Sequence, residues 1–206
     1  MGHVEEKKKM KSDTLFHSAF ELFTSQGFNQ TTISDIVKRA GVAKGTFYLY
    51  FKDKYDIKDK LISYKTSTLF QNALDSYQRA IKGKVMGFND TMIFLINDVV
   101  DQLKQNKPLL RLISKDLSWG VFKNAFYYQS DTIDSDFYDA YQLIMKEDGL
   151  RCDNEELMLF SIVELVGSTC YSSILMGEPE PIDKFKPYLF KNINAIIDSN
   201  CRKISE

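Results

Sequence analysis

A glycine between two short amphipathic segments is the feature that most constrains how this chain folds. Gly41 follows a segment in which the apolar residues Ile33, Ile36, Val37 and Ala40 recur at three- and four-residue spacings. Glycine adopts the left-handed backbone conformation without steric penalty, so it ends one helix and reverses the chain before the next begins. The sequence therefore predicts two short helices joined by a tight turn, which is a helix-turn-helix motif.

The residues before this turn carry helix signals as well. Thr32 and Asp35 have the spacing of a capping box, in which the two side chains satisfy backbone N–H groups at a helix start. Ser12 or Asp13 is placed to cap an earlier helix, and Gly27 ends it. The apolar face of this earlier helix, over residues 14–26, consists of Leu15, Phe16, Ala19, Phe20, Leu22 and Phe23.

The second helix of the pair, over residues 42–50, is expected to expose small and polar residues, while Val42, Phe47 and Phe51 hold it down. A small outer face lets the backbone approach a DNA groove, and hydroxyl and ammonium groups bind base edges and phosphates. A helix start also attracts phosphate. The residues predicted to contact DNA are Thr31, Thr32, Ala43, Lys44, Gly45, Thr46, Tyr48, Tyr50 and Lys54. The alternative for individual positions is a tyrosine at the edge of the core or a solvated lysine.

The charge distribution also indicates that the N-terminal part of the chain binds DNA. Residues 1–60 hold 11 Lys and Arg against 8 Asp and Glu, a net +3, and the remainder holds 16 against 20, a net −4. A local excess is sufficient for DNA because charges are screened within about 10 Å at 0.1 M salt. The basic arm formed by Lys7, Lys8, Lys9 and Lys11 either reaches the minor groove or phosphates or is disordered, and we expect disorder.

Two runs carry a family resemblance. Residues 27–36, GFNQTTISDI, and 40–54, AGVAKGTFYLYFKDK, resemble the DNA-binding region of the tetracycline-repressor (TetR) family, with Ala43 where serine is common and Tyr55 where glutamate is common. The resemblance covers about residues 12–58. It implies an all-helical homodimeric repressor that releases its operator when a small molecule binds. By position, it implies operator contacts from Thr32, Lys44, Gly45, Thr46, Tyr48 and Lys54.

Beyond Lys54, sparse Gly and Pro residues delimit helix-length segments. The expected helices span 54–82, 88–105, 108–118, 121–148 with an interruption near Ser130, 153–176 and 181–202. No alternating strand pattern and no internal repeat is present. We therefore predict an all-α protein of about nine helices. Its expected domains are a three-helix DNA-binding domain, 1–58, and a larger helical effector-binding and dimerisation domain, 59–206.

The second domain contains two apolar stripes near its end and a concentration of aromatic residues. The stripes face either their own core or, as the resemblance favours, a four-helix dimer interface. The residues assigned to that interface are Leu159, Val163, Val166, Gly167, Cys170, Ile174, Leu189, Ile193 and Ile196. The residues assigned to an effector pocket are Phe94, Trp119, Phe122, Phe126, Tyr127, Tyr141 and Glu164, with Asp98 or Asp116 as other counter-charges. Such a pocket suits an apolar, aromatic or cationic molecule.

Few residues are available for other chemistry. Two histidines and three unevenly spaced cysteines, Cys152, Cys170 and Cys201, match no metal or redox motif, and we expect the cysteines to be reduced. No phosphate-binding loop or nucleophile elbow occurs, so neither a cofactor nor an enzymatic activity is expected. The longest uncharged stretch, residues 165–177, is too short to span a membrane. The polar N-terminus is not a secretory signal, so a cytoplasmic location is expected.

The sequence thus predicts a ligand-responsive repressor that binds a palindromic operator as a homodimer. An activator of the same fold is the main alternative, because sequence does not encode the sign of regulation. A helical enzyme or ligand carrier with an appended helix-turn-helix is the remote one. The effector, the operator and the number of dimers on it are not determined by the sequence.

Overall fold

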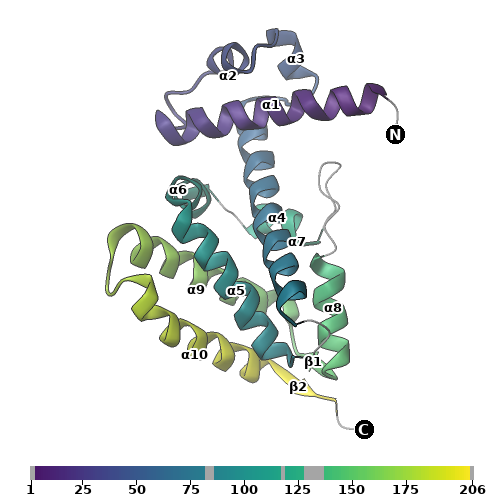
Figure 1. Cartoon of the computed structure of the whole chain (residues 1–206), viewed down its shortest axis with the longest axis vertical. Helices are drawn as coiled ribbons and strands as arrows, with labels where there is room; N and C mark the ends of the chain where they lie inside the picture. The colour runs from purple at the N-terminus through teal and green to yellow at the C-terminus, as the bar shows by residue number, and fades with distance from the viewer. Residues whose placement is uncertain (1–2, 82–85, 117–118, 128–136, 205–206) are drawn as a thin grey trace.

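A computed structural model describes residues 3–81, 86–116, 119–127 and 137–204. It confirms the all-α class, with ten α-helices in the described residues (Figure 1). They are α1 (His3–Ser25), α2 (Ile33–Ala40), α3 (Lys44–Tyr48), α4 (Lys54–Ile81), α5 (Phe88–Gln105), α6 (Lys107–Asp116), α7 (Trp119–Tyr127), α8 (Phe137–Glu147), α9 (Glu155–Cys170) and α10 (Ile182–Asn200). Two strands, β1 (Leu150–Cys152) and β2 (Cys201–Lys203), complete the described elements.

Helix α4 joins two bodies of helices. Helices α1, α2 and α3 form one end of the molecule, and α4 runs from them into the larger body (Figure 1). In the larger body α4 packs against α5 and α7, and α9 packs against α10 and α5. Because α4 is continuous from Lys54 to Ile81, the expected domain boundary between residues 58 and 59 falls inside a helix. The C-terminal strand β2 lies at the far end from α2 and α3 (Figure 1).

The first helix begins earlier than the sequence predicted. Helix α1 starts at His3, so Ser12 and Asp13 lie within it and do not cap its start. The arm of Lys7, Lys8 and Lys9 is therefore helical backbone, and the expectation of disorder is wrong. Lysine has a good helix propensity, and the buried Leu15, near the middle of α1, belongs to the face that anchors the helix on the core.

A short sheet and a disulfide were not anticipated. β1 and β2 pair antiparallel, with Cys152 opposite Cys201, and these two cysteines form a disulfide. The expectation of three reduced cysteines is therefore wrong for this pair, which antiparallel pairing brings together across 49 residues of sequence. Cys170 is a free, fully buried thiol, and burial raises its pKa to about 12.

Helix α9 passes into a π-helical segment, Tyr171–Met176, which ends at Gly177. By length and composition the 22 residues from Glu155 to Met176 are apolar enough to cross a membrane. They pack instead as a core helix, because Met158, Leu159 and Ile162 are buried in the same cluster as residues of α5 and α10.

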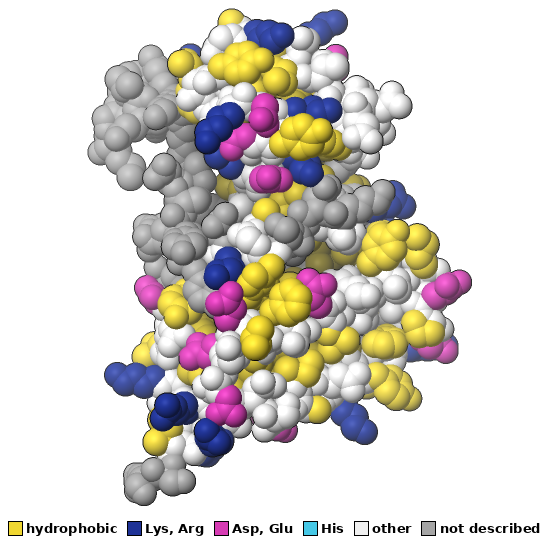
Figure 2. All heavy atoms as spheres, turned by 180° about the vertical axis from the view of Figure 1, so that it is seen from behind, with side chains coloured by type: hydrophobic (Ala, Val, Ile, Leu, Met, Phe, Trp, Pro, Cys, Tyr) yellow, Lys and Arg dark blue, Asp and Glu magenta, His cyan; other side chains and the backbone are white. Residues whose placement is uncertain are grey.

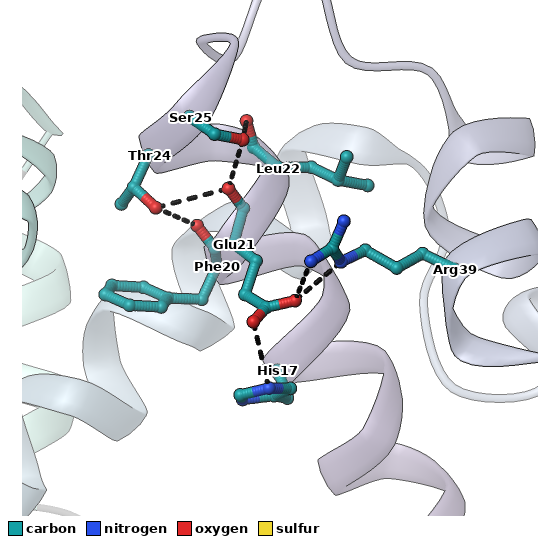
Figure 3. A network of polar contacts seen from close by, with 7 residues as sticks. All are labelled: His17, Phe20, Glu21, Leu22, Thr24, Ser25 and Arg39. Atoms are coloured by element: carbon teal, nitrogen blue, oxygen red, sulfur yellow. Dashed lines mark hydrogen bonds and ion pairs between the residues drawn. The ribbon is translucent and has the colours of Figure 1, made fainter.

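A polar network ties α1 to α2 (Figure 3). The Glu21 carboxylate lies 2.5 Å from the Arg39 guanidinium and 3.3 Å from the His17 imidazole. The Thr24 and Ser25 hydroxyls, one turn further along, donate to backbone carbonyls of α1. Since Glu21 and Arg39 are both partly exposed, this ion pair orients α2 on α1 and adds little stability.

Candidate nucleic-acid interface and effector cavity

The turn between α2 and α3 has the predicted glycine-dependent geometry. Gly41 has φ +66°, and its N–H donates to the Lys38 and Val37 carbonyls. The Val42 N–H donates to the Val37 carbonyl over 3.1 Å. These bonds satisfy carbonyls at the end of α2, and the left-handed residue turns the chain into α3.

The start of α2 forms the predicted capping box. The Asp35 N–H donates to the Thr32 hydroxyl over 3.1 Å, and the Thr32 N–H donates to the Asp35 carboxylate over 2.9 Å. The Thr32 hydroxyl also donates to the same carboxylate over 2.7 Å. Hydrogen bonds from Thr32 hold the pKa of the Asp35 carboxyl below its ordinary value. Thr32 remains exposed at the helix start, where the dipole favours an anion.

The N-terminal end of α3 is open to solvent. Ala43, Lys44 and Gly45 are exposed, whereas Phe47 on the opposite side is fully buried. A Cβ built on Gly45 would meet no atom within 4 Å, so nothing inside this chain requires glycine there. In the space-filling view, Lys and Arg side chains lie over this end of the molecule among acidic and hydrophobic ones (Figure 2).

The remaining predicted contacts on and after α3 are divided between solvent and core. Tyr48 is 53% exposed, and Thr46 and Tyr50 are half-buried. Leu49, which the sequence interpretation left out, is 77% exposed beside Tyr48.

Two predicted DNA contacts have internal partners instead. Thr31 is fully buried, and its hydroxyl donates to the Gly27 carbonyl over 2.8 Å. The prediction that Thr31 contacts DNA is therefore wrong. Lys54 donates from Nζ to the carbonyls of Phe28 and Thr31 over 2.9 and 3.0 Å. Its ammonium thus joins the start of α4 to the loop between α1 and α2, where backbone oxygens compete with phosphate for it.

A cavity of about 380 Å³ lies in the larger body. It is lined by residues of α4, α5, α6, α7 and α9 and by Tyr171, the first residue of the π-helical segment. Its lining is mostly apolar, as in small-molecule sites generally. The lining residues are Thr66, Leu69, Phe70, Met92, Leu95, Ile96, Val99, Leu103, Leu110, Ile113, Ser114, Phe122, Phe126, Leu159, Ile162, Val163, Glu164, Val166, Gly167, Ser168 and Tyr171.

Three of the predicted effector residues line this cavity: Phe122, Phe126 and Glu164. Phe122 and Phe126 stack with ring centroids 5.4 Å apart. Trp119 stacks on Phe122 from outside the lining, at 5.0 Å, and its indole N–H donates to Glu156 over 3.0 Å. This bond, with a second from a lysine of α7, holds the pKa of the Glu156 carboxyl below its ordinary value.

Phe94, Tyr141 and Asp98 do not line the cavity. Phe94 packs edge-on against Tyr77, and Tyr141 is buried against Phe126 and Phe88. Asp98 accepts a hydrogen bond from Gln102. The side chains of Tyr127 and Asp116 lie outside the described part of the structure.

The residues predicted for the dimer interface are buried or half-buried in the subunit. Leu159, Val163, Val166 and Gly167 line the cavity, and Ile196 packs on the core. The remaining four are buried in the subunit: Cys170, Ile174, Leu189 and Ile193. The five buried residues face the subunit's own core, as the alternative had it, whereas Val163, Val166, Gly167 and Ile196 are half-buried, and their place in a dimer interface stays a prediction. The pattern marks an apolar face without indicating what covers it.

The exposed surface of α9 and α10 is different and was missed. Leu157, Phe160 and Tyr188 are 60%, 39% and 68% exposed. Hydrophobic side chains are visible in the lower half of the rear face, on the side of α9 and α10 (Figure 2). Within the described residues no group of three or more His, Cys, Asp or Glu side chains is arranged to hold a metal ion.

Comparison with known proteins is consistent with this geometry. Residues 15–60 match the family model of "Bacterial regulatory proteins, tetR family". The chain is 39% identical over 111 residues to the uncharacterized HTH-type transcriptional regulator YvdT of Bacillus subtilis, covering 52% of this chain and 53% of that protein. It is 28% identical over 139 residues to the HTH-type transcriptional regulator QacR of Staphylococcus aureus, covering 68% and 71%. The first alignment thus spans about half the relative's length.

A solved structure extends the likeness of fold over most of the chain. The transcriptional regulator FadR from Bacillus subtilis, in complex with stearoyl-CoA, superposes with a TM-score of 0.60. The alignment covers 87% of this chain and 96% of that one at 18% identity. At this identity the likeness shows the fold alone.

Proposed function

Because this chain belongs to the tetR family of bacterial regulatory proteins, we propose that it is a ligand-responsive transcriptional repressor. The observation that carries the proposal is the open N-terminal end of α3, where Ala43, Lys44 and Gly45 are exposed and a Cβ on Gly45 would meet no atom within 4 Å. Ala43 and Gly45 approach the floor of the major groove, Thr46 contacts base edges, and Lys44 binds a phosphate beside them. Tyr48, Tyr50 and the Thr32 end of α2 bind phosphates.

Thr31 and Lys54 stabilise this DNA-binding surface through contacts within the subunit. Lys54 fixes the loop before α2 through two backbone carbonyls, and Thr31 closes the same loop through Gly27. Both residues therefore position the helix-turn-helix and do not read the operator.

The cavity and the DNA-binding end share two helices. Helices α4 and α6 both line the cavity and both contact α1. Thr66, in the cavity wall, lies twelve residues from Lys54 along α4, about 18 Å at 1.5 Å per residue. A ligand that shifts α4 or α6 moves the helix-turn-helix, so ligand and operator binding oppose each other by a coupling of about 1–3 kcal/mol.

A homodimer places two recognition helices on one palindromic operator. One five-residue helix such as α3 contacts few bases, and a second half-site lies about 34 Å along the duplex. We assign the dimer contact to the outward face of α9 and α10, where Leu157, Phe160 and Tyr188 are exposed. Exposed apolar side chains on neighbouring helices are typical of a surface that a partner covers.

The effector we propose is a small, largely apolar molecule, in keeping with the cavity lining. FadR of Bacillus subtilis, which has this fold, was solved with stearoyl-CoA. A cytoplasmic location, where operator DNA is accessible, belongs to the same proposal. Activation is the alternative sign of regulation, and a reporter under the native promoter decides it: deleting the gene raises expression for a repressor and lowers it for an activator.

Genomic footprinting with the purified protein tests DNA binding. We expect protection of a palindrome, lost when Lys44 and Tyr48 are both replaced by alanine. The absence of any protected sequence from the full-length protein would refute the proposal. We expect a control protein that carries Leu143→Asp, at an exposed position on α8, to retain the footprint.

A further inference from the structure

The cavity has a polarity that identifies the class of its ligand. Most of the lining is aliphatic or aromatic, and five lining residues carry polar side chains: Thr66, Ser114, Glu164, Ser168 and Tyr171. Its volume of about 380 Å³ corresponds to about a dozen waters at 30 Å³ each, the size of a small organic molecule. Two of these five indicate the ligand class: Thr66 offers a hydrogen-bonding group, and Glu164 sets the preferred charge of the ligand.

The Thr66 hydroxyl is the anchor. Thr66 is 3% exposed, and its Oγ1 has no hydrogen-bond partner in the described part of the chain. A buried hydroxyl without a partner is unfavourable, and neighbouring Ser67 satisfies its own by donating to the Ala125 carbonyl of α7 over 3.1 Å. Thr66 thus retains hydrogen-bonding capacity where the wall meets the cavity, and a ligand group supplies the missing partner.

The charge of the lining sets the preference. Glu164 is the one charged residue among the described lining residues, and neither Lys nor Arg lines the cavity there. It is exposed, so it lies where the cavity meets solvent. A carboxylate at the entrance of an apolar site repels an anion and is compatible with a neutral or cationic group, which aromatic walls also favour.

We propose that the cavity binds an apolar molecule that carries a hydrogen-bonding group for the Thr66 hydroxyl and no negative charge. This inference rests on the proposed effector function and narrows it. An acyl carboxylate or a phosphorylated acyl carrier fits poorly, because the described lining offers no cation to pair with it.

Three probes with the same chain and different heads test the proposal: 1-decanol, decyltrimethylammonium and decanoate. Binding is measured by calorimetry on the full-length protein without DNA. Trp119, the one tryptophan of the chain, stacks on Phe122 of the cavity wall, so its fluorescence locates the bound probe. We expect 1-decanol and decyltrimethylammonium to bind with a change in Trp119 emission, and decanoate to bind at least about tenfold more weakly.

Two substitutions test separately the hydrogen bond to Thr66 and the charge preference set by Glu164. Thr66→Val keeps the shape of the side chain, and we expect it to weaken 1-decanol binding about threefold to tenfold without lowering the melting temperature of the free protein. Glu164→Gln should strengthen decanoate binding and weaken that of the cation. Equal affinity for decanoate and 1-decanol, no binding of either preferred probe, or an unchanged affinity in Thr66→Val would each overturn the inference.

The outcome is independent of the regulatory proposal. If the probes bind as expected but no operator is protected, the ligand class stands and the repressor function fails. If an operator is protected and the probes do not bind as expected, the repressor function stands and the ligand class is wrong.

Discussion

The ammonium of Lys54, the first residue of α4, donates a 2.9 Å hydrogen bond to the backbone carbonyl of Phe28 and lies 4.3 Å from the centre of its ring. It is thereby placed as a clamp between the connecting helix and the loop before α2. A lysine at this position was expected to contact phosphate. Two backbone carbonyls accept hydrogen bonds from this ammonium without DNA, so we propose that Lys54 affects operator binding through the geometry of the loop.

Lys54→Ala should lower the melting temperature and weaken operator binding, while the slope of log affinity against log salt remains unchanged. The reason is that the clamp carries no phosphate contact. Lys44→Ala, on exposed α3, should reduce the steepness of that slope by about one unit. Gel-shift titrations between about 50 and 200 mM salt measure the slopes of both variants, because affinity that depends on phosphate contacts falls steeply over this range. A slope reduced by one unit in Lys54→Ala would show that it binds phosphate.

Gly45→Ala should weaken DNA binding without lowering the stability of the fold. Nothing in the chain meets a Cβ at this position, and alanine is favoured over glycine in a helix by up to about 1 kcal/mol, so the free energy of unfolding should stay the same or rise. The added methyl group occupies the space between backbone and groove, and operator affinity should fall about tenfold or more. Urea denaturation and gel shifts report the two quantities. Unchanged affinity would show that α3 does not approach DNA at Gly45.

The capping box should make part of the stability depend on pH. The pKa of the Asp35 carboxyl is lowered in the folded chain by Thr32, so the ionised form is favoured by folding. Its contribution is complete above the ordinary aspartate pKa of about 4 and is lost as the pH falls through the lower folded value. We expect the stability difference between wild type and Asp35→Asn, from urea midpoints, to shrink between pH 6 and pH 3. A difference constant over that range would contradict this assignment.

Charge placed on the outward face of α9 and α10 should prevent dimerisation. Leu157→Asp and Tyr188→Asp put carboxylates on residues that are 60% and 68% exposed, so the subunit fold is retained while an apolar contact is lost. Light scattering should give a mass near twice 23.8 kDa for wild type and near 23.8 kDa for either variant. Leu143→Asp, at a residue 55% exposed on α8, is the matched control and should remain dimeric. A dimeric Tyr188→Asp protein would place the interface elsewhere.

Local signals were sufficient for the helices and for the turn. Gly41, the Thr32 and Asp35 pair and the three- and four-residue spacings act within one or two turns of the chain, so they can be read without knowing what packs against them. The expected helices over 54–82, 88–105 and 108–118 differ from α4, α5 and α6 by no more than two residues at either end. The same locality explains why the open α3 end was identifiable.

Tertiary structure decided which atoms each side chain contacts. The periodicity of Leu159 and Val163 indicates an apolar face, and only the convergence of five helices makes that face a cavity wall. Lys54 has a long, flexible side chain, and the carbonyl it reaches belongs to a loop 26 residues earlier. Likewise, Cys152 and Cys201 meet only because two short strands pair. Periodicity is a property of neighbours in sequence, whereas partners in space depend on how the whole chain packs.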